Sequence, residues 1–177
     1  MKCIAIFLSI FIASPVVAQG ANANSASSAV GTAGSVWKSV SNYLVRAAEQ
    51  MPEADYAFRP TADVRSFGQL IGHVAGAQYM MCAVALGEKN RPENDIEKTK
   101  TTKAELVEAL KASSEYCARA YAQSDADASA MTKIYGQDHT KLWVLVSNAT
   151  HDNEHYGNLV TYMRIKGMVP PSSQPRR

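Results

Sequence analysis

Two histidines four residues apart, His151 and His155, are the residues of this sequence best suited to chemistry. Residues at positions i and i+4 of an α-helix lie on the same face, so both imidazoles can reach one metal ion. A third histidine, His73, lies in another segment with helical periodicity. Three histidine ligands would leave a zinc-type site one open position for water or substrate. The alternative is a histidine pair on a solvated helix face that binds nothing.

Residues 151–155 also match H-x-x-E-H, the inverted zinc-protease motif, in which Glu154 would be the general base. Those proteases take a further carboxylate ligand far downstream, and only 22 residues follow His155. We therefore reject the protease assignment. Glu154 stays a candidate for catalysis, and the simpler interpretation is a solvated helix glutamate.

The remaining histidine, His139, lies twelve residues before His151. A continuous helix would separate the two by about 18 Å, so His139 cannot share the ion and is expected at the surface near the helix start. Four other polar residues of this segment are candidates for orienting the ligands or the substrate: Asn148, Glu154, Asn158 and Tyr162.

Four segments repeat apolar residues with the period of an α-helix, over about residues 30–51, 67–86, 102–121 and 140–166. Capping residues or helix-ending residues stand at their borders. These are Pro52, Ser66, Gly87, Thr102 and Gly167. No stretch alternates cleanly over a strand's length. The sequence predicts an all-α fold, a four-helix bundle with one longer crossover connection and no substantial sheet.

The N-terminus has the three parts of a secretory signal peptide: a basic Lys2, an apolar run over residues 3–13, and small residues before Ala18. The run is too short to anchor the chain in a membrane, and no other run is long and apolar enough to cross one. We expect residues 1–18 to be the signal peptide, 19–28 a flexible leader, and 29–177 one domain. The mature protein is then exported, to the periplasm or the medium.

The charge of the chain is nearly balanced, with 18 basic and 16 acidic residues. Such a balance gives no reason to expect a nucleic acid or an anionic membrane as partner. The expected partner is a small-molecule substrate, which the sequence does not identify, and a homodimer stays open.

Two cysteines, Cys82 and Cys117, remain after removal of the signal peptide. An exported location permits a disulfide between them. The alternative is two buried thiols that act as small apolar residues.

The chain carries three motifs, at residues 66–75 around His73, at 151–159 and at 163–171. In their order and spacing they resemble the DinB-like superfamily of four-helix metalloproteins, which is named for DNA-damage-inducible members. The resemblance covers nearly the whole mature chain. It implies that His73, His151 and His155 bind one divalent transition metal ion, with zinc expected and nickel, manganese or iron as alternatives. Many members carry glutamine where Asn158 stands and arginine where Tyr156 stands, so the residues around the ligands differ here.

The resemblance implies several reactions. Members with known activity include thiol-dependent transferases and isomerases, and others are described as metal-dependent hydrolases. In each, a bound ion would lower the pKa of water or of a thiol to supply a nucleophile. Low-molecular-weight thiols are mainly cytoplasmic, so export favours a hydrolase of an unknown small substrate. The alternatives are a non-catalytic metal-binding or stress-related helical protein, and a thiol-dependent transferase.

Overall fold

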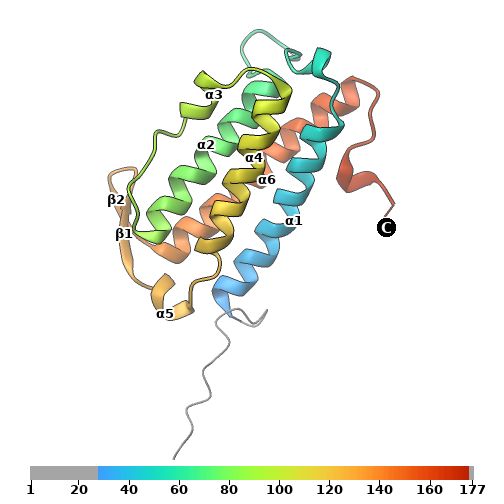
Figure 1. Ribbon diagram of the computed structural model, residues 1–177. Coiled ribbons are helices and arrows are strands. Elements are labelled where there is room, and N and C mark those ends of the chain that lie inside the picture. The colour runs from blue at the N-terminus through green and yellow to red at the C-terminus, as the bar shows by residue number, and fades with distance from the viewer. Residues whose placement is uncertain (1–27, 176–177) are drawn as a thin grey trace, which may run out of the picture.

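Four long helices make up most of the described part of the chain (Figure 1): α1 Ala29–Gln50, α2 Phe67–Leu86, α4 Lys103–Ala120 and α6 Lys141–Ile165. The computed structural model describes residues 28–175. The expected signal peptide, and the expected leader except its last residue, lie outside these residues. The predicted four-helix fold is confirmed.

The helix ends follow from local hydrogen bonds that the sequence indicated. The side chain of Ser66 accepts from the backbone N–H of Gln69, whose side chain accepts from the N–H of Ser66, so α2 begins with a complete capping box. It ends at Gly87, whose φ of 73° lies in the left-handed region that glycine enters without strain. Thr102 caps α4 in the same reciprocal way.

Helix α2 is the central element of the bundle, packing against both α4 and α6. By length and composition it could cross a membrane, yet 83% of its most apolar window is buried within the fold. The sequence analysis expected no second segment long and apolar enough to cross a membrane. Helix α2 meets that description by length and composition, so the expectation is wrong for this segment. Its composition is that of a core helix, because apolar residues face neighbours on nearly every side.

The connection from α2 to α4 is the predicted crossover. After α2 ends, the chain runs back along the length of the bundle and forms the short helix α3, Asp95–Thr99, before α4 begins (Figure 1). Helix α3 packs against α2. The crossover thereby covers one side of the helix that carries His73.

A small β-hairpin, which the sequence analysis did not predict, precedes α6. Strand β1, Met131–Ile134, pairs antiparallel with β2, Gln137–Thr140. Both turn residues, Tyr135 and Gly136, have positive φ, as a two-residue type I′ turn requires. Four-residue strands are too short to show a clear alternation in sequence. The short helix α5, Asp125–Ala128, and the 3₁₀ turns Glu53–Asp55 and Pro171–Ser173 also lie in connections or after α6.

A disulfide between Cys82 and Cys117 joins α2 to α4, with the two Cα atoms 5.3 Å apart. Both residues are fully buried. The alternative of two free thiols is therefore wrong.

Replacing both cysteines by alanine is expected to lower the free energy of unfolding by about 3–4 kcal/mol, because the bridge closes a loop of 35 residues in the unfolded chain. Urea unfolding of the mature protein measures the change. Wild-type protein in reductant is the control and should lose a similar amount. Unchanged midpoints for the double variant would contradict a stabilising bridge.

Candidate metal centre

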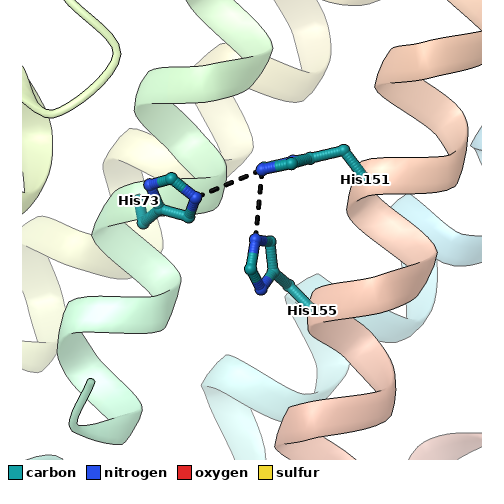
Figure 2. A group of neighbouring side chains, drawn as sticks. All are labelled: His73, His151 and His155. Atoms are coloured by element: carbon teal, nitrogen blue, oxygen red, sulfur yellow. Dashed lines mark hydrogen bonds between the residues drawn. The ribbon is translucent and has the colours of Figure 1, made fainter. Parts of the chain in front are cut away.

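The structure brings the three predicted histidines together between α2 and α6 (Figure 2). The Nε2 atom of His151 lies 3.1 Å from Nε2 of His73 and 3.1 Å from Nε2 of His155. All three potential ligand atoms lie within 4.8 Å of one another. His73 and His155 are buried and His151 is half-buried. Helix periodicity alone supplied the pair, and the packing of α2 on α6 supplies the third ring.

The spacing of these nitrogens fits a shared cation. Zinc–nitrogen bonds of about 2.05 Å at tetrahedral angles place two ligand nitrogens about 3.3 Å apart. The rings cannot satisfy one another by hydrogen bonding, because a neutral imidazole has one N–H and Nε2 of His151 faces two other Nε2 atoms. In addition, no residue among 28–175 forms a hydrogen bond with the buried Nδ1 of His151. A shared metal ion would therefore satisfy the three Nε2 atoms better than hydrogen bonds between the rings can.

Burial keeps the imidazoles neutral. It is the largest cause that lowers the pKa of His151 to about 3, with further lowering by His155, His73 and Arg65. Burial, followed by His73 and Arg65, lowers the pKa of His155 to about 4. The pKa of His73 is lowered by burial first and Arg65 second. Neutral imidazoles have the free lone pairs that metal binding requires.

Polar side chains approach the other ring nitrogens. Nδ1 of His73 lies 3.4 Å from Oδ1 of Asn94 and 3.8 Å from Oε2 of Glu97. Nδ1 of His155 lies 3.3 Å from Nδ2 of Asn158, and a reversed Asn158 amide would present its oxygen there instead. Metal-ligating histidines usually donate their second ring N–H to such oxygens, which fixes the ring. Oε1 of Glu93 lies 3.7 Å from Nε2 of His73, on the side where an ion would sit.

Glu93, Asn94 and Glu97 come from the crossover, and the sequence analysis missed them. The sequence did contain a signal for a close approach at this place, namely Gly72 and Gly76, which flank His73 on α2. A Cβ on Gly76 would overlap the carbonyl oxygen of Glu93, and one on Gly72 would lie 2.8 Å from Cα of Glu97. The two glycines thus let the crossover backbone lie directly on α2, and its polar side chains reach His73 as a result.

The other predicted candidates lie in different surroundings. Glu154 is exposed and lies outside the histidine cluster. Asn148 is buried, and its Nδ2 donates to the hydroxyl of Tyr121. The Tyr162 hydroxyl donates to the backbone carbonyl of Arg65 at 2.8 Å. His139 is half-buried in β2 with its ring stacked on Trp143, so it stands on the hairpin and outside the cluster.

A buried hydrogen bond joins the two helices that carry the histidines. Nε2 of Gln78 donates to Oδ2 of Asp152 at 2.7 Å, and both residues are fully buried. Oε1 of Gln78 accepts from the hydroxyls of Ser113 and Ser114 on α4. Burial raises the pKa of Asp152 to about 8. This network ties α2, α4 and α6 together immediately beside His151.

A pocket of ≈ 670 Å³ opens beside His155. Its volume lies within the range of small-molecule sites. Its wall includes Arg65, Leu70, Glu97, His155, Asn158 and Tyr162. Of the three histidines, His155 lines this pocket, so a small molecule in the pocket would contact the edge of the cluster.

Comparison with known proteins identifies the family. The sequence model of the DinB superfamily matches residues 37–159. This chain belongs to the DinB superfamily. Among solved structures, a DinB-like protein from Bacillus cereus ATCC 10987 is similar at a TM-score of 0.69 and 15% identity, covering 78% of this chain and 93% of that one. A DinB-like protein from Bacillus subtilis is similar at a TM-score of 0.56 and 19% identity, covering 82% and 99%. At these identities the likeness shows the fold. No curated protein matches the chain.

Substitution of Gly76 by alanine is expected to displace the crossover and to lower the free energy of unfolding by about 2 kcal/mol or more, because the new methyl overlaps the Glu93 carbonyl. The control is Gly157→Ala on α6, where a Cβ meets nothing within 4 Å. That variant should be unchanged or up to about 1 kcal/mol more stable, from helix propensity. Equal stability of the two variants, measured by urea unfolding, would contradict the close approach.

The metal-free DinB-like protein should lose stability as the pH falls from 7 to 5. The folded histidines have pKa values below the unfolded value of about 6.5, so acid protonates the unfolded state first. Each such group removes at most about 1.4 kcal/mol per pH unit. The raised pKa of Asp152 has the opposite effect on stability, because its folded form holds the proton more tightly than its unfolded form. The three histidines outweigh this single group.

Urea unfolding of chelator-treated protein at several pH values measures this slope. His151→Asn should flatten it, because one of the three histidines with a lowered pKa is then removed. A stability that rises steadily toward pH 5 would contradict neutral buried histidines.

Proposed function

We propose that this protein binds one divalent transition metal ion through Nε2 of His73, His151 and His155 and is a metal-dependent hydrolase of a small substrate. The observation that carries the proposal is the convergence of three neutral imidazoles from two helices, with 3.1 Å between adjacent Nε2 atoms. Membership of the DinB superfamily supports a metal at this place. Histidine nitrogens suit zinc first, with nickel, manganese or iron as alternatives.

The chain's own residues divide the work at this site. When bound, a divalent ion acts as a Lewis acid and supplies a nucleophile near neutral pH. The three imidazoles hold its position, and the Asn94 and Asn158 side chains orient the rings through Nδ1 of His73 and His155. The carboxylate of Glu93 lies 3.7 Å from Nε2 of His73, close enough to accept a hydrogen bond from a group beside that nitrogen.

The pocket beside His155 favours catalysis over metal storage, because it gives a small molecule a route to the cluster. A non-catalytic metal-binding protein is the second candidate. It is favoured by the burial of His73 and His155, which resembles a structural site with little access.

Export of the mature protein is part of the proposal. The Cys82–Cys117 disulfide supports it, since such bridges form and persist in oxidising compartments. Such a compartment is poor in the reduced thiols that a thiol-dependent transferase would use. Hydrolysis needs only water as co-reactant, so it fits an oxidising compartment better than thiol transfer does.

Metal content is the decisive measurement. The purified mature protein should contain about one ion per chain. His73→Ala, His151→Ala and His155→Ala should each lose most of it, while His139→Ala keeps it. Retention of wild-type metal content by all three variants would refute the site. A screen of the loaded protein against nitrophenyl esters, and against thiol transfer to a chlorodinitrobenzene, then separates hydrolase, transferase and non-catalytic protein.

A further inference from the structure

Arg65 is held in place from two sides at the edge of the metal centre. Its Nε lies 3.1 Å and 3.2 Å from the two carboxylate oxygens of Glu97. Its backbone carbonyl accepts the hydroxyl of Tyr162. The next residue, Ser66, is the N-cap of α2 and so fixes the chain direction. An arginine fixed in this way loses little further freedom when it binds a ligand.

The outer end of this guanidinium is available. Glu97 occupies Nε, and among residues 28–175 no hydrogen-bond or ion-pair partner occupies Nη1 or Nη2 of Arg65. The side chain is 39% exposed and lines the pocket that also reaches His155. Its positive charge is one cause that lowers the pKa of all three histidines.

The charges around the pocket decide what it admits. In the part of the chain that the structure describes, Arg65 is the one cationic residue that lines it, while Asp63 and Glu97 line it as anions and Glu93 lies against His73. Arg59, whose Nη1 donates to the carbonyl of the lining residue Val64, adds a second cation at the rim. A divalent ion at the histidines would add positive charge for a ligand that spans the ion and Arg65. The floor includes the buried apolar Leu70, which suits a short carbon chain.

We propose that the pocket beside His155 takes a small organic acid, whose carboxylate is bound by Nη1 and Nη2 of Arg65 while the rest of the molecule faces the metal centre. Two parallel N–H donors match the two oxygens of a carboxylate. Glu97 is then a positioning residue, because it turns the guanidinium so that these donors face the pocket. This inference rests on the metal-dependent function proposed above and adds the substrate class.

The test uses the cobalt(II)-loaded mature protein, and isothermal titration calorimetry measures ligand binding whether or not the ligand coordinates the ion. Acetate and its neutral analogue acetamide are titrated separately. Arg65→Gln should weaken acetate binding about tenfold or more, as expected for a lost charge-assisted pair, and should leave acetamide within twofold. The acetate affinity of Arg65→Lys should lie between those of the wild type and Arg65→Gln. Arg119→Gln is the matched control, since Arg119 is likewise paired with a glutamate, Glu88, outside the pocket.

The outcomes separate this inference from the function on which it rests. A wild-type protein that takes up no cobalt refutes the metal centre itself. A loaded protein whose Arg65→Gln variant binds acetate like wild type shows capture by the metal alone and overturns the role of Arg65. Equal weakening of acetate and acetamide binding by Arg65→Gln also overturns the role of Arg65. If Arg65→Gln has an altered helix content and Arg65→Lys binds acetate no more tightly than Arg65→Gln, the role of Arg65 is likewise overturned.

Discussion

The fixed alignment of α2 against α6 is the constraint on which the rest of this site depends. The buried hydrogen bond between Gln78 and Asp152 sets it, together with the apolar contacts of both helices. Gln78 stands five residues after His73, and Asp152 directly follows His151. A slip of one residue along either helix would turn its side chains by about 100° and separate the imidazoles. The same shift would leave a buried carboxyl group without its partner, which is strongly unfavourable.

The parts of the site that the sequence predicted are those governed by local geometry. The spacing of His151 and His155 requires only a helix, and the bounds of α2 followed from Ser66 and Gly87, which act within one turn of the helix ends. Family resemblance then supplied the pairing with His73. These predictions needed no knowledge of how distant segments pack.

The parts that the sequence missed depend on close approach between distant segments. The polar side chains of the crossover reach His73 because two glycines remove the side chains that would keep the backbones apart. The disulfide, which the sequence left open against two free thiols, likewise depends on the distance between α2 and α4. The hairpin before α6 rests on a turn with tyrosine where asparagine or glycine is usual, so its strongest sequence signal is weakened.

The two sides of the histidine cluster differ in a way that bears on chemistry. On one side the crossover lies on α2 and brings Glu93, Asn94 and Glu97 against His73, so this side is packed and oriented. On the other side the pocket brings Arg65 and Asn158 to His155 and leaves room for a ligand. Glu97 belongs to both, because one oxygen approaches His73 while both bind Nε of Arg65. Through this single carboxylate, the packing that orients a metal ligand also aims the cation that faces the pocket, so a change in the crossover would alter both at once.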